Sequence, residues 1–211
     1  METRILTLSE EAIAQAAALL RSGDLVIFPT DTVYGVGALI THPQAVARLY
    51  RVKDRPGEKA IPLLIADPED LEQAVTKVTP AARRLIARFW PGGLTLVLPK
   101  RPEVPAEVSP GPTVAVRLPD HEGVRALIRA AGAPLAATSA NRSGQPSPRT
   151  AQEALAQLGG RVPLILDGGP CPGGVPSTVV DCTVDPPRLL REGAIPASEI
   201  RRELGFLRGE Q

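Results

Sequence analysis

The sequence is poor in several residue types, and each shortage excludes a class of protein. Its 211 residues include one Asn, two Cys and four Lys, and only 3% of them are aromatic. The two cysteines, Cys171 and Cys182, are too few for the disulfide framework of a small secreted protein. Neither has a histidine close to it in the sequence, so a zinc-ligand spacing is absent as well. We interpret both as free thiols, buried or partly exposed, in a reducing compartment.

Long apolar runs and an excess of charge of one sign are also missing. No stretch approaches the ~20 apolar residues that a membrane-spanning helix needs. The N-terminal segment 1–4 does not open an apolar signal region. The net charge is +1, so no global field draws the chain to a nucleic acid or to a membrane. These features predict a cytoplasmic protein without membrane contact, in which any basic site is local.

Familiar catalytic signatures are absent too. The sequence has no phosphate-binding loop of the Gly-x-x-x-x-Gly-Lys-Ser/Thr type and no Gly-x-Gly-x-x-Gly turn after a strand. It has no Gly-x-Ser-x-Gly elbow, and neither His42 nor His121 lies where a catalytic base and its orienting partner would be expected. We therefore expect neither nucleophilic catalysis nor a metal held by protein ligands.

The chain does contain short apolar runs that alternate with amphipathic segments, which predicts an α/β fold. Predicted strands cover residues 4–8, 25–27, 61–66, 94–98, 113–117, 135–138, 162–166, 178–182 and 188–191. Predicted helices cover residues 9–22, 42–52, 68–75, 80–89, 120–131, 150–158 and 197–204. The predicted capping residues include Ser9, Thr79 and Asp120. The late strand pair predicts a mixed parallel and antiparallel sheet. We expect a single domain over residues 1–211, with a core at about 9–195 and a short helix and tail at 196–211.

The polar stretch after the buried strand 25–27 is unusual for a connection. Three hydroxyls and a carboxylate lie within five positions, at Thr30, Asp31, Thr32 and Tyr34. Loops at strand ends carry the functional sites of many α/β proteins. Gly35 and Gly37 allow the backbone to turn or another group to approach closely. The alternative interpretation is a local turn in which a Thr or Asp side chain binds its own backbone.

A basic group at a predicted helix end is a candidate for phosphate binding. Lys53, Arg55 and Lys59 lie beside Pro56 and Gly57. The planar guanidinium of Arg matches phosphate oxygens, and Lys adds a mobile point charge. The alternative is a solvated helix end, where cations are stabilised by the negative end of the helix dipole.

The loop at 138–141 is a second candidate. Ser139 and Asn141 follow a predicted strand, and Asn141 is the single Asn of the chain. Hydroxyls and an amide at a strand end can bind a phosphate or a ribose, although a simple turn is the alternative. Arg117 and Arg191 each end a predicted strand and can reach a common crevice. For both, as for Ser177, a surface position is an equally good interpretation.

Six motifs occur in one order along the chain. They are Phe28-Pro29-Thr30-Asp31-Thr32-Val33-Tyr34-Gly35, Lys53-x-Arg55-Pro56, Trp90-Pro91-Gly92-Gly93-Leu94-Thr95, Val116-Arg117-Leu118-Pro119, Ser139-Ala140-Asn141 with Ser143-Gly144, and Ser177-Thr178-Val179-Val180-Asp181. In this combination they resemble the YrdC family, the threonylcarbamoyl-adenylate synthases. The resemblance extends over nearly the whole chain, from about Ile13 to Ile195, and implies the short form with one YrdC-like domain.

The resemblance implies a twisted mixed sheet with flanking helices and a concave, positively lined cleft. It implies the conversion of L-threonine, bicarbonate or CO2, and ATP to threonylcarbamoyl-adenylate and pyrophosphate. Mg²⁺ is expected to arrive on the triphosphate, held partly by substrate oxygens and water. The product is expected to pass to a separate threonylcarbamoyl transferase that modifies position 37 of tRNA.

The resemblance also implies roles for individual residues. The expected catalytic group around the phosphates consists of Lys53, Arg55, Ser139 and Asn141. Further ATP contacts are expected at Arg55, Lys59, Thr113, Ser139, Asn141, Arg149 and Arg191. Threonine contacts are expected at Thr32, Arg117 and Ser177. From the residues themselves, and not from the resemblance, we expect the apolar segment Leu63-Leu64-Ile65 to contact the methyl group of threonine.

Two other functions remain open at this point. One is a binding module for double-stranded RNA or tRNA that uses the same basic cleft, although the low net charge, few lysines and few aromatic residues argue against it. The other is a carbamoyl-adenylate step on a different acceptor, as in larger proteins that contain a YrdC-like domain. A weak direct contact with tRNA is compatible with the main interpretation.

Overall fold

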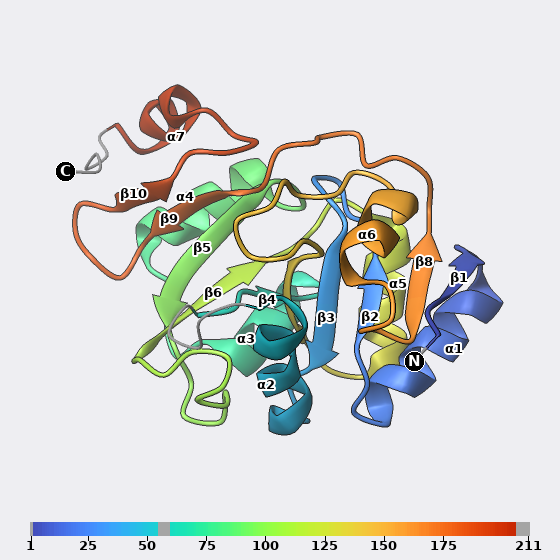
Figure 1. The fold of residues 1–211 in the computed structure, drawn as a ribbon. Helices are drawn as coiled ribbons and strands as arrows, with labels where there is room; N and C mark the ends of the chain where they lie inside the picture. Colours follow the sequence, from blue (N-terminus) through green and yellow to red (C-terminus); the bar gives the residue numbers. More distant parts are fainter. Residues whose placement is uncertain (1, 55–59, 206–211) are drawn as a thin grey trace.

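The computed structural model describes residues 2–54 and 60–205. A mixed sheet runs through the molecule with the strand order β1-β8-β2-β3-β7-β4-β6-β5-β9-β10 (Figure 1). The strands are β1 (Arg4–Thr7), β2 (Val26–Phe28), β3 (Gly35–Leu39), β4 (Leu63–Leu64), β5 (Leu94–Pro99), β6 (Thr113–Arg117), β7 (Leu135–Ser139), β8 (Leu164–Asp167), β9 (Thr178–Asp181) and β10 (Arg188–Arg191). The helices are α1 (Glu10–Arg21), α2 (Pro43–Val52), the 3₁₀ turn η1 (Pro68–Asp70), α3 (Leu71–Ala74), α4 (Pro80–Phe89), α5 (Glu122–Ala131), α6 (Ala151–Leu158) and α7 (Ala197–Leu204).

The sheet combines both pairing directions, as the sequence predicts. Strand β8 pairs in parallel with β1 and β2, β4 with β6, and β5 with β9. The remaining pairs are antiparallel, and they include the predicted late hairpin β9–β10. The prediction of a mixed α/β sheet is therefore confirmed.

Helix starts follow the capping residues that the sequence offers. The Ser9 hydroxyl accepts a hydrogen bond from the backbone N–H of the third helical residue of α1, and Thr79 does the same for α4, each at 3.2 Å. At α5 the prediction was wrong in detail, because the cap is His121 and not Asp120. The Nδ1 atom of His121 accepts from the N–H of Val124 at 3.3 Å.

The two faces of the sheet carry separate apolar clusters, because successive side chains of a strand point to opposite sides. On β2, Val26 and Phe28 belong to the cluster that contains the buried side chains of α1 and α5. Ile27, between them, belongs to the cluster that contains those of α2, α3, α4, α6 and α7. Thus, of the helices within residues 2–54 and 60–205, α1 and α5 alone cover this face of the sheet, and they contact each other.

Strand β3 corrects the prediction of a loop between Pro29 and His42. Gly35 and Gly37 lie in this strand, paired with Phe28 and Val26 of β2. A Cβ atom on Gly37 would lie 2.9 Å from the ring of Phe28, and one on Gly35 would lie 3.0 Å from it. The close approach that these glycines allow is therefore the packing of the Phe28 ring across the strand.

Two other elements differ in extent from the prediction. The apolar run 61–66 forms a strand only at Leu63–Leu64, and the segment 68–75 divides into η1 and the short helix α3. No helix in the described part of the chain is long and apolar enough to cross a membrane.

Candidate active site

A cleft of about 350 Å³ lies on the sheet face that α1 and α5 share. The strand registers place Gly35, Ser139, Leu64, Arg117 and Thr95 on that face. Gly35 of β3 pairs with Ser139 of β7, whereas Leu64 of β4 pairs with Leu135 of β7 and with Arg117 of β6. The apolar cluster under α1 and α5 includes residues of β2, β7 and β8 but none of β5, β6 or β9. The cleft therefore opens where the same face continues beyond the two helices.

The cleft brings together five of the residues that the sequence singled out. They are Thr32, Arg117, Ser139, Ser177 and Arg191. Among the described residues, its charged lining consists of the two arginines, and no Asp or Glu contributes to it. The arginines come from separate strands, β6 and β10, so the fold brings together positions 74 residues apart in the sequence.

The turn after β2 is held by Thr30. Its hydroxyl oxygen accepts hydrogen bonds from the N–H groups of Thr32 (3.1 Å) and Val33 (3.2 Å) and lies 2.7 Å from the carbonyl oxygen of Val33. This is the local turn that the sequence left as an alternative. It coexists with a position in the cleft, since Thr30, Thr32 and Val33 all line it.

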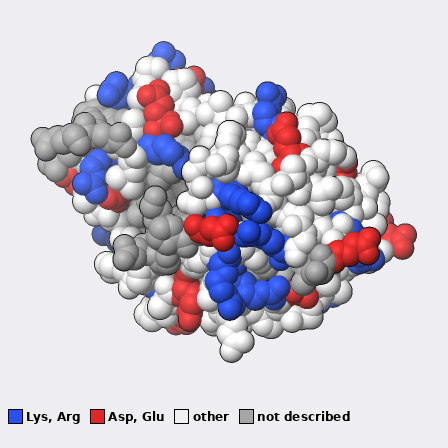
Figure 2. Space-filling view, viewed as in Figure 1, with Lys and Arg blue, Asp and Glu red and all other residues white. Residues whose placement is uncertain are grey.

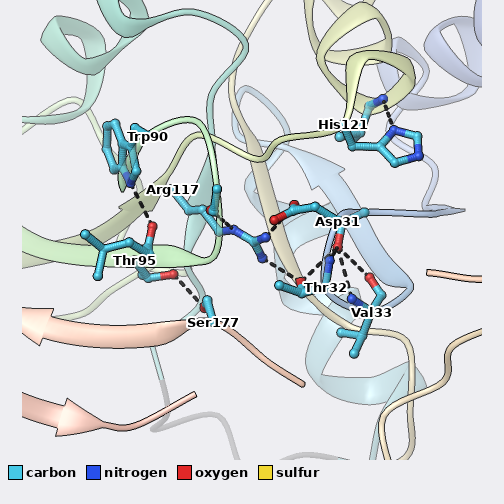
Figure 3. Close-up of polar contacts among 12 residues, drawn as sticks. Asp31, Thr32, Val33, Trp90, Thr95, Arg117, His121 and Ser177 are labelled. Atoms are coloured by element: carbon cyan, nitrogen blue, oxygen red, sulfur yellow. Dashed lines mark hydrogen bonds and ion pairs between the residues drawn. The ribbon is translucent and has the colours of Figure 1, made fainter. Parts of the chain in front are cut away.

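Arg117 is fixed on three sides before any ligand binds (Figure 3). Its Nη2 donates to Asp31 Oδ1 at 2.5 Å, its Nη1 to Thr32 Oγ1 at 2.8 Å, and its Nε to the carbonyl of Gly92 at 2.9 Å. The residue is 6% exposed. Burial lowers the pKa of Arg117, and the charge of Asp31 acts in the opposite direction. A guanidinium remains protonated in proteins, so the cleft wall holds a fixed positive group.

The hydroxyl groups of Thr95 and Ser177 also line the cleft. Ser177 Oγ lies 2.8 Å from Thr95 Oγ1, and Arg191 donates from Nη2 to the carbonyl of Ser177 at 2.8 Å. The same Arg191 atom lies 3.3 Å from Ser177 Oγ. Arg191 itself is exposed, so its guanidinium is anchored at the rim of the cleft. This arrangement offers hydroxyls and one cation to a polar ligand.

The residues predicted to bind phosphate lie at the end of α2, next to the loop after β7. Lys53 is buried, and its Nζ donates to the carbonyl oxygen of Ser139. The N–H of Ser143 donates to the carbonyl of Lys53 at 2.8 Å. Arg55 and Lys59 lie outside the described residues. The structure thus joins the described part of the Lys-x-Arg segment directly to the Ser-x-Asn segment.

Asn141 has an oxygen without a protein partner. Its Nδ2 donates to the carbonyls of Arg142 (2.9 Å) and Gln145 (2.8 Å), which fixes the orientation of the amide, because reversing it would set an oxygen against two oxygens. The residue is 8% exposed, and among the described residues nothing hydrogen bonds to its Oδ1. What Asn141 has left for a ligand is therefore an acceptor, suited to a hydroxyl, a water molecule or a cation.

Three of the described residues predicted to contact ATP lie outside the cleft lining: Asn141, Thr113 and Arg149. Thr113 begins β6 on the same face as Ala115 and Arg117, opposite Pro99 of β5. Arg149 is exposed, and its side chain packs over Gly174, where a Cβ atom would lie 2.8 Å from its Nε. All three remain predictions as nucleotide contacts.

Sequence reasoning did not assign a role in the site to Asp31 or Thr95, whereas Leu64 belongs to the apolar segment predicted to contact the methyl group of threonine. Asp31 binds Arg117, Thr95 pairs with Ser177, and Leu64 supplies an apolar wall of the cleft. Asp31 and Thr95 do lie within the motifs that carried the family resemblance, which was the available signal for them. The hydroxyl of Tyr34, by contrast, points away to Gly169 O (2.8 Å) and Asp167 Oδ1 (3.2 Å), and burial raises its pKa.

A basic region lies on the face of the molecule that carries α2 and α6. Figure 2 shows Lys and Arg side chains gathered around a hollow near the middle of this face. Between the end of α2 and α6, a pocket of about 380 Å³ is lined by residues that include Asp54, Arg142 and Gln157. Arg161 donates to Asp54 Oδ2 at 3.0 Å, so part of this positive charge is already paired.

Comparisons with known proteins agree with the features of the sequence and of the cleft. Residues 18–193 match the Sua5/YciO/YrdC family model, which is described as "Telomere recombination". The chain is 46% identical over 202 residues to a threonylcarbamoyl-AMP synthase of Bacillus subtilis, and 45% identical over 202 residues to that of Pyrococcus abyssi. Each alignment covers 95% of this chain.

A solved structure extends the likeness to the fold. The crystal structure of Pyrococcus abyssi Sua5 complexed with L-threonine matches with a TM-score of 0.96 and 43% identity, over 99% of this chain. The chain spans 58% and 59% of the two curated relatives and 63% of the crystallised chain. On its sequence, its fold and the match over residues 18–193, the chain belongs to the Sua5/YciO/YrdC family.

Proposed function

We propose that the protein is an L-threonylcarbamoyladenylate synthase, a nucleotidyltransferase that forms threonylcarbamoyl-AMP and pyrophosphate from L-threonine, bicarbonate or CO2, and ATP. The observation that carries the proposal is the cleft in which Thr32, Arg117 and Ser177, the predicted threonine contacts, meet Ser139 and Arg191. The likeness to a relative crystallised with L-threonine supports it. A cytoplasmic location and a separate threonylcarbamoyl transferase that consumes the product belong to the same proposal.

The threonine end of the cleft combines a fixed cation with hydroxyls. The carboxylate of threonine pairs with Arg117, a charge-assisted interaction that is stronger than one between neutral groups. The substrate hydroxyl binds among Thr32 and Ser177, and its methyl group contacts Leu64. A buried guanidinium is effective here because a low local dielectric strengthens its attraction for a carboxylate.

The reaction joins three reactants in two bond-forming steps. The amine nitrogen of threonine bonds to the carbon of CO2 with loss of a proton, or to that of bicarbonate with loss of water, and gives a carbamate. A carbamate oxygen then bonds to the α-phosphorus of ATP, and the bond to the β-phosphate oxygen breaks as pyrophosphate leaves. Positioning of reactants can supply several kcal/mol of the barrier reduction. Lys53, Arg55 and Arg191 offset the negative charge that builds on the leaving pyrophosphate.

The residues of the site fit an ATP-bound Mg²⁺ ion that is held mainly by phosphate oxygens and water. Such ions are commonly bound in proteins through only one or two protein groups. Among the described residues, no three His, Cys, Asp or Glu side chains gather as a ligand set. The unpartnered oxygen of Asn141 is the kind of neutral ligand that Mg²⁺ or one of its water molecules accepts. The ion would neutralise charge on the triphosphate.

One assay tests the proposed reaction directly. Purified protein is incubated with ATP, Mg²⁺, bicarbonate and L-threonine, and pyrophosphate release is measured. We expect release to require both threonine and bicarbonate. Release that is indifferent to both would contradict the proposal, because it would report simple ATP hydrolysis.

Binding of double-stranded RNA or tRNA is a second candidate function, favoured by the basic hollow on the face with α2 and α6 (Figure 2). Binding through backbone phosphates loses affinity steeply as salt rises. A titration of a fluorescent tRNA at several salt concentrations measures how the affinity depends on salt. Affinity that persists at physiological salt, without threonine-dependent pyrophosphate release, would favour RNA binding over the synthase.

A further inference from the structure

The guanidinium of Arg117 already holds a carboxylate of its own chain. Arg117 and Asp31 form a 2.5 Å ion pair, with side chains that are 7% and 15% exposed. Arg117 lines the cleft, whereas Asp31 is not among its lining residues, and Figure 3 shows Asp31 beside the guanidinium. The pair therefore has one member that lines the cleft and one member that contacts this lining residue.

The hydrogen bonds of Arg117 within the protein determine how many of its N–H groups are available to a substrate. A guanidinium carries five N–H groups, one on Nε and two on each terminal nitrogen. Asp31, Thr32 and Gly92 take one each, from Nη2, Nη1 and Nε. Among the described residues, one N–H on Nη1 and one on Nη2 thus have no partner. A bidentate contact with a carboxylate uses two such groups on one edge of the guanidinium.

The backbone of Asp31 is also held firmly. Its carbonyl accepts a hydrogen bond from the N–H of Gly173 at 3.1 Å, and the carbonyl of Thr32 accepts one from Gly174 at 2.8 Å. A Cβ atom on Gly173 would lie 2.7 Å from the Asp31 carbonyl oxygen, so only glycine permits this approach. The carboxylate is therefore presented to Arg117 by a turn that is fixed from two sides.

We propose that Asp31 is a positioning residue, which orients the two remaining N–H groups of Arg117 toward the carboxylate of an amino-acid substrate. Of the three partners of Arg117, only Asp31 carries a charge, so it alone compensates the buried guanidinium. The pair is neutral as a unit, and the cleft can thus bind a zwitterionic amino acid without gaining an uncompensated charge. The assignment of that substrate as threonine rests on the function proposed above.

A spectroscopic measurement tests the positioning without any substrate. In ¹⁵N spectra, the Nη protons of a guanidinium held on three sides are expected to give separate signals, assigned to Arg117 by their absence in Arg117→Lys. In Asp31→Ala these signals should average, and in Asp31→Asn, which keeps one acceptor oxygen, they should remain partly resolved. Separate Arg117 signals that persist unchanged in a folded Asp31→Ala variant would overturn the proposal.

Calorimetric titration then measures the consequence for binding. We expect the dissociation constant for threonine to rise about tenfold in Asp31→Ala and by less in Asp31→Asn, while that for ATP changes by less than about twofold. Asp24→Asn is the matched control, because it removes the carboxylate of another Asp–Arg pair, with Arg48 at 3.0 Å, of which neither member lines the cleft. Unchanged threonine affinity in Asp31→Ala, or a parallel loss for threonine and ATP, would contradict the role of Asp31. Failure of the unmodified protein to bind threonine would instead contradict the proposed function, and the spectra would still decide the positioning.

Discussion

At the scale of single residues, Asn141 offers the most specific test of the proposed nucleotide-binding site. Its amide N–H groups are used by two loop carbonyls, so its free oxygen can meet a metal ion or its water but not a phosphate oxygen. We therefore expect Asn141→Ala to weaken binding of a non-hydrolysable ATP analogue about tenfold in Mg²⁺ and hardly at all in EDTA. Calorimetric titration in the two buffers measures this difference.

A neighbouring side chain provides the control for that experiment. Gln145 is exposed, and only its backbone carbonyl takes part in the contact with Asn141. Gln145→Ala should therefore leave nucleotide affinity unchanged in both buffers. If Asn141→Ala weakened binding equally with and without Mg²⁺, the amide would contact the nucleotide itself.

Discrimination among amino acids also depends on single groups. A pocket that hydrogen bonds a substrate hydroxyl rejects an analogue that lacks it, because its own polar groups are then left unpaired. We expect valine to be a much worse substrate than serine, since serine loses only a methyl contact of roughly 1–3 kcal/mol with apolar groups such as Leu64. Competition assays of pyrophosphate release with the three amino acids measure the order. Valine that matches or exceeds serine would exclude a hydroxyl-binding pocket.

The residues of the site were predictable to different degrees. Hydroxyls and cations at strand ends drew attention to Thr32, Arg117 and Ser177, and the cleft contains all three. No local pattern shows that the carboxylate of Asp31 reaches an arginine 86 positions later. That contact depends on where the turn after β2 meets the end of β6, which is a property of the folded sheet.

At the scale of elements, strand β3 depends on two positions without side chains. A Cβ atom on Gly37 would lie 2.9 Å from the Phe28 ring and 3.3 Å from the carbonyl oxygen of Ala136. We expect Gly37→Ala to lower the free energy of unfolding by about 1–3 kcal/mol, because the crowded ring and strand must shift. Urea denaturation measures the change.

Another glycine offers a matched control for this substitution. Nothing lies within 4 Å of a Cβ atom built on Gly111, and its φ is outside the positive range. Gly111→Ala should leave the free energy of unfolding unchanged or raise it slightly, since alanine restricts the unfolded chain. Equal effects at the two positions would mean that contact with Phe28 does not limit β3.

The helices were easier to predict than this strand. Ser9 and Thr79 carry capping hydroxyls next to amphipathic segments, and both helices begin where these residues indicate. Gly35–Leu39 has two glycines in five residues and lacks the β-branched alternation that marks a strand. Its conformation is set by pairing with β2 and β7 on either side, which the sequence of the segment does not reveal.

At the scale of the whole molecule, uneven covering of the sheet creates the cleft. Two helices pack on one face and the remaining helices on the other. The sequence predicts which segments are helical, but it does not say how far α1 and α5 extend across ten strands. The position of the cleft over β4, β6, β5 and β9 follows from strand order, and that order joins segments distant in the chain.

The two cysteines report on the opening of the whole molecule. Both are free, as the sequence predicts, and of the two predicted alternatives, buried or partly exposed, both are buried, with exposed fractions of 1% and 2%. Burial raises the pKa of Cys171 and raises that of Cys182 to about 12, so neither forms the reactive thiolate readily. We expect neither thiol to react with iodoacetamide in the time that labels the urea-unfolded protein completely.

Bound ligands should slow the labelling of the two cysteines to different extents. Cys171 lies beside the turn at Thr30, and its N–H donates to the carbonyl of Arg149, whereas Cys182 lines a different pocket, next to α4. We expect ligands in the cleft to oppose both the local and the global unfolding that expose Cys171. For Cys182, we expect them to oppose only the exposure that results from global unfolding. We therefore expect ATP and threonine together to slow labelling of Cys171 more than that of Cys182, as measured by mass spectrometry of the peptides. Equal slowing would show that both thiols become accessible only when the whole sheet unfolds, and faster labelling of Cys171 would contradict a stabilising effect of the ligands on the turn at Thr30.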